Sequence, residues 1–245
     1  MRRRHLIGSL AALSTLPFAA RTSAQPSTSS IVPASYDTFD EWIAAARSGS
    51  LQFLQTPIGL QPRHLISLLA LWGAAMPRDP DVWQTPWNEL PGANAPLEFN
   101  TLSAGRPFVV SAFRMAPGCL LPAHCHPGGG GITLCVAGEL KLEHFNLEPG
   151  SADFRQRGGA ARVRYESVAH LTPERYTWFT PEISNLHRLR AGPEGAIGVD
   201  LAVQWQGGGE FSFLRFADAD AAQAARVGEL FDGVWSGMNI VDAYA

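Results

Sequence analysis

The amino-acid sequence predicts a mainly β protein, an antiparallel sandwich or barrel with helices before it and one helix after it. Between residues 107 and 216 the chain carries short apolar runs separated by turns rich in Gly and Pro, a pattern typical of antiparallel strands. On either side of this region, apolar residues recur at helical spacing. With 245 residues, 46% of them apolar and 17% charged, the chain is long enough for one domain with a full core.

Two helices are expected before the strands. Thr38 can cap the first, with Glu41 three residues later, and one face would carry Trp42, Ile43 and Ala46. In the second, Pro62 suits the first turn and Pro77 stops the helix; its apolar face would carry Leu65, Ile66, Leu68, Leu69 and Trp72. We expect His64 to be an exposed residue in the first turn of this second helix.

The strand region follows a stretch dense in Pro and Asn over residues 79–104, where Trp83 and Trp87 are expected to pack against the domain. Strands are expected at residues 107–115, 132–145 as two runs about Gly138, 162–168, 176–179, 186–189, 196–205 and 211–216. A final helix is expected from Asp218 to Phe231, with Asp218 as its N-cap. We see no internal repeat and no second domain.

The first 24 residues read as a processing segment. Three arginines, Arg2 to Arg4, precede an apolar stretch, and Thr22-Ser23-Ala24 offers a cleavage site. The pair Arg3-Arg4, followed by one free position and then apolar residues, resembles a twin-arginine export signal, which carries folded proteins; a general secretory signal or an uncleaved anchor are the alternatives. Residues 25–35 would form a flexible leader, residues 36–245 the single domain, and the mature protein would be periplasmic, without membrane contact.

Charge and cysteine content limit the partners of the mature protein. Removing the four arginines of residues 1–24 from the formal charge of −3 leaves −7, which disfavours nucleic-acid binding. Three clustered cysteines, Cys119, Cys125 and Cys135, do not resemble a disulfide framework. We expect thiols that pack in the core or support the site, with one oxidised pair as the alternative. The oligomeric state is left open, and a monomer is one option.

The motif that carries chemistry is Pro122-Ala-His124-Cys-His126-Pro-Gly. Strand side chains alternate, so His124 and His126 would project from one side toward one metal ion, and Cys125 would point away. The best third ligand is His187, in another expected strand. Three imidazoles with open positions suit a catalytic first-row metal.

Four other polar residues have expected positions or roles outside the set of three metal ligands. His144 and His170 are expected at the surface or rim, because neither falls in a matching motif. Arg114 is expected to face solvent, or to hold a carboxylate if it faces inward. Tyr176 is a candidate base for non-redox chemistry.

The order of His-x-His, glycine-bearing turn, Gly138 and a distant His resembles a cupin, a double-stranded β-helix barrel. Common cupins carry a Glu shortly after the second His, where this chain has Gly128 to Gly131; thiol dioxygenases also lack that carboxylate. The branch with 2-aminoethanethiol dioxygenase and the plant cysteine oxidases is closer. Its Pro-Leu-His-Asp-His-Pro-Gly resembles Pro122 to Gly128, and its Asn-Ile/Leu-His resembles Asn185 to His187. The resemblance covers about residues 79–216.

The resemblance implies an Fe(II) enzyme that adds both atoms of O2 to a small thiol or an N-terminal cysteine, giving a sulfinate. His124, His126 and His187 would hold the iron, and Asp200, 13 residues after His187, matches an active-site Asp of that branch; a structural strand-end Asp is the alternative. Cys125 replaces the branch's Asp, and its Pro-Pro-Tyr is absent after Asp200, so the thiol stays open. Alternatives are a zinc or manganese lyase or isomerase, or a binding cupin without turnover.

Overall fold

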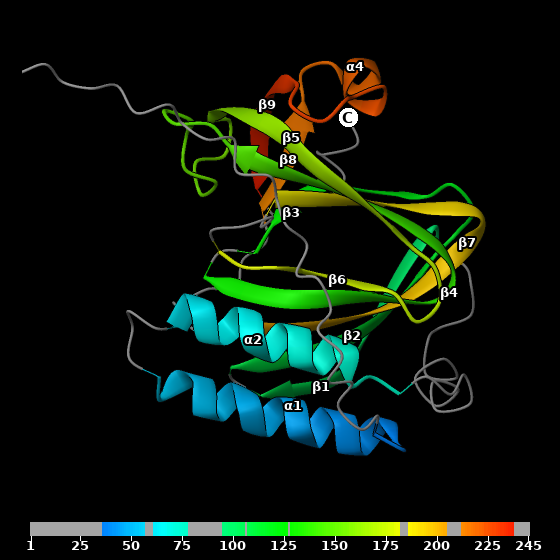
Figure 1. Ribbon diagram of the computed structural model, residues 1–245. Coiled ribbons are helices and arrows are strands. Elements are labelled where there is room, and N and C mark those ends of the chain that lie inside the picture. Colours follow the sequence, from blue (N-terminus) through cyan, green and yellow to red (C-terminus); the bar gives the residue numbers. More distant parts are fainter. Residues whose placement is uncertain are drawn as a thin grey trace, which may run out of the picture. The chain divides into compact units, whose positions relative to one another are not determined.

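The computed structural model describes residues 36–56, 61–77, 95–105, 107–126, 128–181, 186–204 and 212–237 (Figure 1). All of them lie in one compact unit, Val32–Ala245. The expected signal and leader, and also Trp83 and Trp87, lie outside the described residues. No helix within these ranges is long and apolar enough to cross a membrane.

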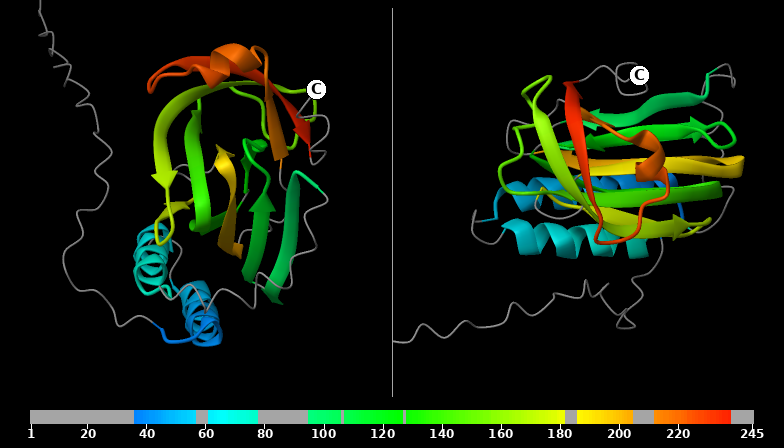
Figure 2. Two further views of the ribbon diagram at one scale, coloured as in Figure 1. Left: turned by 90° about the vertical axis from the view of Figure 1, so that its right-hand side faces the viewer. Right: turned by 90° about the horizontal axis from the view of Figure 1, so that it is seen from above.

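Both predicted N-terminal helices are confirmed. Helix α1 spans Phe39–Leu54, and the Thr38 hydroxyl accepts a hydrogen bond from the Glu41 backbone N–H at 3.2 Å. Helix α2 spans Gln61–Ala74. Their apolar faces share one core cluster with three barrel strands; its members include Trp42, Phe53, Leu65, Leu69, Val110, Ile132 and Leu201. The helices therefore cover the outer face of one side of the barrel (Figure 2).

Among the described residues there are nine strands, and each is antiparallel to its hydrogen-bonded neighbours. They are β1 Leu97–Gly105, β2 Phe108–Met115, β3 Leu120–Cys125, β4 Gly129–Leu147, β5 Ala160–Leu171, β6 Tyr176–Phe179, β7 Leu186–Gln204, β8 Ser212–Phe216 and β9 Leu230–Gly237. Their order is β1-β2-β7-β3-β8-β9-β5-β4-β6, and β7 also pairs with β4. That extra pairing closes the sheet, so the predicted mainly β barrel is confirmed. Strand β1 falls in the Pro- and Asn-rich stretch for which no strand was predicted.

Strands β4 and β7 were each predicted as two short runs, and each is one long bent strand. Gly138 has a φ of +72°, and a Cβ there would lie 2.2 Å from the Gly195 carbonyl oxygen. Only glycine fits such a conformation and approach. The bend lets one β4–β7 ladder run through both halves of the barrel.

Alternation along these strands separates a helix-facing side from a barrel interior. Val199 and Leu201 of β7 pack with the helices, so Asp200 between them faces the interior. Thr133 of β4 faces the same way, because its hydroxyl bonds Asp200. The interior is therefore partly polar.

The predicted C-terminal helix is much shorter than Asp218 to Phe231. Helix α4 covers only Ala219–Gln223, with Asp218 as its N-cap as predicted. Gly228 then adopts a φ of +96°, and its N–H donates to the Tyr165 carbonyl at 2.7 Å. The chain continues as β9, because alternating residues such as Trp235 fill a second core under β5 and β8.

Candidate metal centre

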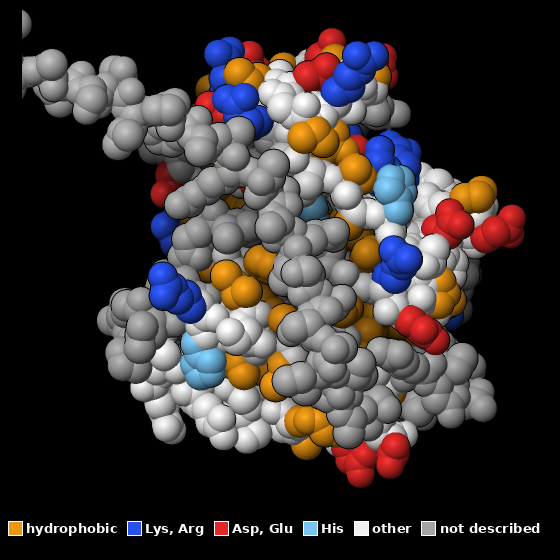
Figure 3. Space-filling view, in the orientation of Figure 1, with side chains coloured by type: hydrophobic (Ala, Val, Ile, Leu, Met, Phe, Trp, Pro, Cys, Tyr) orange, Lys and Arg blue, Asp and Glu red, His pale blue; other side chains and the backbone are white. Residues whose placement is uncertain are grey.

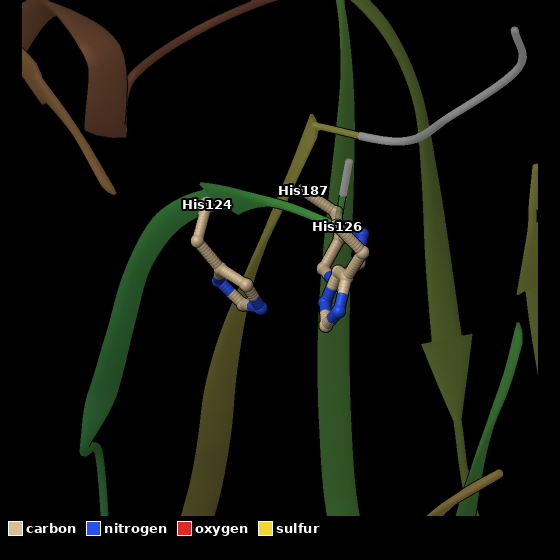
Figure 4. Close-up of side chains that lie close together, drawn as sticks. All are labelled: His124, His126 and His187. Carbon is tan, nitrogen blue, oxygen red and sulfur yellow. The ribbon is translucent and has the colours of Figure 1, made fainter. Parts of the chain in front are cut away.

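Three histidines converge inside the barrel (Figure 4). His124 lies on β3 with His126 just beyond its end, and His187 lies on β7 as the Cα partner of His124. One ligand atom from each ring lies within 4.8 Å of the others. No other group of this kind occurs among the described residues, and no carboxylate belongs to it. The structure thus brings together the three residues that the sequence singled out.

Burial keeps the imidazoles of His124 and His126 in the neutral form that binds metals. His124 and His187 are 5% and 2% exposed. Burial lowers the pKa of His124 to about 4, although the Pro122 carbonyl opposes this shift. Burial, with a contribution from His124, also lowers the pKa of His126. Neutral imidazoles are metal ligands.

One hydrogen bond orients the His124 ring. Its Nδ1 lies 2.9 Å from the Pro122 carbonyl oxygen. A carbonyl only accepts, so Nδ1 carries the proton and Nε2 keeps its lone pair for a ligand role.

Aromatic rings line the site on two sides. Phe179 of β6 stands 4.7 Å from the His126 ring and 4.9 Å from the His187 ring, between centroids. Phe213 of β8 stands 5.6 Å from His124. The histidine group is therefore in contact with apolar rings from β6 and β8.

Asp200 lies on β7 between Ser111 of β2 and Thr133 of β4 in the ladder. The Thr133 hydroxyl donates to Asp200 Oδ1 at 2.6 Å. Burial raises the pKa of Asp200 to about 6, and the Thr133 hydrogen bond opposes that rise. Asp200 is half-buried in the interior but does not belong to the histidine group. Asp200 therefore lies outside the three-histidine ligand set.

His144 corrects the sequence prediction. It was expected at the surface or rim, yet it is 3% exposed and is the Cα partner of His187. Its ring stands 6.1 Å from that of His187, and its Nε2 lies 3.5 Å from the Thr177 hydroxyl. Buried Leu140 and Leu142, four and two positions earlier, could have revealed this inward position. His170 is exposed, as predicted.

Other candidates point away from the histidines. The Tyr176 hydroxyl donates to the Ala70 carbonyl at 3.3 Å, so its ring lies under α2. Arg114 pairs with Glu98 at 3.6 Å and is half-buried rather than fully solvent-facing. His64, predicted to be exposed, is also half-buried, against Thr56 and Phe53.

The cysteines are free and serve in packing. Cys125 belongs to the second core, on the other side of β3 from the histidines. Burial raises its pKa to about 12. Cys135 and Cys119 pack in or against the core near Phe113.

Sequence reasoning missed a buried ion pair behind the site. Arg188 of β7 donates through Nε to Glu143 of β4, whose other oxygen lies 2.9 Å from Lys141 Nζ and accepts from the Tyr165 hydroxyl at 3.3 Å. Burial alone would raise the pKa of Glu143, but Arg188 and Lys141 outweigh it and lower that pKa. Glu143 therefore stays ionised.

No family model and no curated protein matches this chain. Among solved structures, it is similar to an uncharacterised protein with a double-stranded β-helix domain from Klebsiella pneumoniae (19% identity, 52% of this chain and 87% of that chain, TM-score 0.37). It is also similar to an RmlC-like cupin from Shewanella frigidimarina (17% identity, 49% of this chain and 86% of that chain, TM-score 0.33). A third similar structure is a cupin superfamily protein from Desulfitobacterium hafniense (14% identity, 47% of this chain and 83% of that chain, TM-score 0.32). These neighbours are cupin-type proteins. The likeness concerns the fold alone and carries nothing about the reaction.

Proposed function

We propose that this protein is an exported, Fe(II)-dependent thiol dioxygenase that converts a small thiol or an N-terminal cysteine, with O2, into a sulfinate. The observation that carries the proposal is the convergence of three imidazoles, His124, His126 and His187, without a carboxylate in their group. Three neutral ligands leave the +2 charge of the ion uncompensated, which favours a thiolate.

The donor set fits iron but does not select it. Imidazole suits zinc, copper, nickel and iron alike. His124, His126 and His187 would hold the ion. Bound Fe(II) would supply the redox chemistry by which both oxygen atoms are added to sulfur.

Asp200 supports a substrate that carries a cation. It is the acidic side chain placed in the interior beside Thr133, whereas Arg114 is engaged with Glu98. An ionised carboxylate there can accept hydrogen bonds from an ammonium group or from water. A thiol with an amino group would therefore fit better than one with only a carboxylate.

The alternative of a zinc or manganese lyase or isomerase needs a base beside the metal. Tyr176 was the candidate, and its hydroxyl is bound to α2. That position weighs against the alternative. The assay of oxygen uptake distinguishes the proposed enzyme from a cupin that binds a ligand without turnover.

The test is oxygen uptake by metal-free protein loaded with Fe(II), Zn(II) or Mn(II) in turn. We expect uptake with Fe(II) alone, one O2 consumed per sulfinate formed, and cysteamine or N-terminal-cysteine peptides preferred over 3-mercaptopropionate, with free cysteine as the fourth thiol. Equal activity with Zn(II) would remove the proposal, since zinc has no redox chemistry. Metal binding without uptake of O2 for any thiol would favour a binding module.

Export is proposed from Arg3-Arg4 and the apolar stretch after them. Replacing both arginines by lysine should trap the precursor in the cytoplasm, as measured by fractionation. Unimpaired export of this variant would favour the general secretory route, and no export of the wild type would contradict a periplasmic location.

A further inference from the structure

The two strands that place His144 and His187 in the interior carry Glu143 and Arg188 on their opposite face. Glu143 and Arg188 are Cα partners, and so are His144 and His187 one step along the same ladder. The Arg188 and Glu143 side chains are 4% and 2% exposed. A buried ion pair thus lies directly behind the step that positions His187.

Arg188 is held from three directions. Its Nε donates to Glu143, and its Nη2 donates to the carbonyl oxygen of Ala222 in α4. Its guanidinium also lies over the rings of Phe145 and Phe216, at 5.5 Å and 5.4 Å from their centroids. A planar guanidinium has a fixed fork of donors, so these contacts fix the backbone next to His187.

The Arg188 side chain links helix α4 to strand β7, which carries His187. The helix connects β8 to β9, and Ala222 within it is fully buried. Glu143 gains further partners in Lys141 and Tyr165. A buried charge that loses a partner is strongly destabilised, so the group keeps one arrangement.

We propose that Arg188 and Glu143 are positioning residues for the metal centre, and that Arg188 couples α4 to metal binding at His187. This rests on the metal site of the proposed function but not on its reaction. Replacing a residue that supports a metal ligand from behind typically lowers metal affinity by about 10–100-fold. Coupling is reciprocal, so bound metal must also stabilise α4.

Two variants separate positioning from charge burial. Arg188→Lys keeps the charge but loses the planar fork. The double variant Glu143→Gln/Arg188→Met leaves no unpaired buried charge, which makes folding achievable. The matched control is Arg162→Met/Asp232→Asn, which removes a bidentate ion pair of 2.7 Å and 2.9 Å between β5 and β9 that is exposed and remote from the ladder step at His187.

Co(II) is the probe, because its affinity and absorption spectrum report the ligand geometry without turnover. We expect at least about tenfold weaker Co(II) binding and an altered spectrum in both Arg188 variants, with wild-type behaviour in the control. Co(II) should also slow hydrogen exchange of the α4 amides in the wild type and control only. A purely structural role would lower the melting temperature and leave the spectrum unchanged.

If the double variant folds and keeps the wild-type Co(II) affinity and spectrum, the inference is overturned. If Arg188→Lys does not fold, the double variant alone provides the test. Unchanged α4 exchange in the wild type on adding Co(II) overturns the coupling. No Co(II) binding by the wild type would instead overturn the three-histidine site itself.

Discussion

At the residue scale, His144 and His187 show how two histidines on facing strands can differ in role. His187 belongs to the group of convergent ligand atoms, whereas His144 lies behind it and contacts Thr177. Both are buried, so burial alone does not separate a ligand from a supporting residue.

Replacing His187 by Ala should leave the barrel folded and reduce bound iron at least about tenfold, since one of three ligands is lost. His144→Ala should keep most of the metal but lower the free energy of unfolding by on the order of 1–3 kcal/mol, because it leaves a void. Exposed His170→Ala is the control and should change neither quantity. Metal analysis and urea denaturation measure both. Loss of metal in His144→Ala, with full content in His187→Ala, would show that the ligand set is wrong.

Asp200→Asn should change the pH dependence of stability. The folded-state pKa of about 6 lies above the usual 3.8, so the native state binds more protons than the unfolded state between these values, and stability falls as pH rises through this window. The variant lacks this loss and should be more stable at pH 7 by on the order of 1–2 kcal/mol, allowing for solvent at this half-buried group. Urea denaturation from pH 4 to 7 checks it. A variant less stable than wild type at pH 7 would contradict the pKa shift.

At the element scale, the bend of β4 depends on one glycine. Gly138→Ala adds a Cβ that would lie 2.2 Å from the Gly195 carbonyl oxygen at a φ of +72°. Gly118→Ala is matched to it, because Gly118 has a φ of +68° with nothing within 4 Å of the added Cβ.

The control substitution should cost about 1–2 kcal/mol from the positive φ alone. Gly138→Ala should cost at least about 2 kcal/mol more, because backbone atoms must move. Chemical denaturation gives both values. Equal losses in the two variants would mean that the bend has room for a side chain.

The β8–α4–β9 segment differs from its predicted structure because its local and long-range preferences conflict. The Ala-rich sequence after Asp218 favours helix, and the N-cap does start one. Beyond Gly228 the chain pairs with β5 and β8, and Trp235 becomes fully buried. Strand pairing with β5 and β8 and the burial of Trp235 therefore outweigh the helix propensity of this segment.

At the scale of the whole molecule, the barrel brings the three candidate ligands together, so metal binding is expected to stabilise the fold. The ligand atoms come from β3 and β7 and lie within 4.8 Å only in the folded chain. Among the side chains coloured by charge in Figure 3, acidic and basic groups are interspersed rather than gathered into one basic face.

A divalent ion at a free concentration about 100 times its dissociation constant should raise the free energy of unfolding by about 2.7 kcal/mol. This corresponds to a rise in melting temperature of roughly 5–11 °C for a domain of this size, reversed by a chelator. His187→Ala should show no such rise. A similar rise in that variant would place the ion at another site.

The sequence by itself determined the features that depend on near neighbours. Caps at Thr38 and Asp218 require only the following turn, and the two-residue spacing of His124 and His126 sets a common side of β3. His124 and His126 were identified in this way, whereas His187 was inferred from the need for a third ligand and from the family resemblance. The role of all three as metal ligands stays a prediction, as does the catalytic role of Asp200.

Only the tertiary structure decided features that depend on distant partners. Arg188 and Glu143 are 45 residues apart in sequence, and each is an ordinary charged strand residue until the ladder joins them under α4. For His144, alternation with Leu140 and Leu142 indicates the inward side of the strand, but its place as the Cα partner of His187 depends on β4 continuing through its bend to pair with β7. Burial of a polar side chain is set by cross-strand contacts and by the layer packed above it, and no local pattern records either.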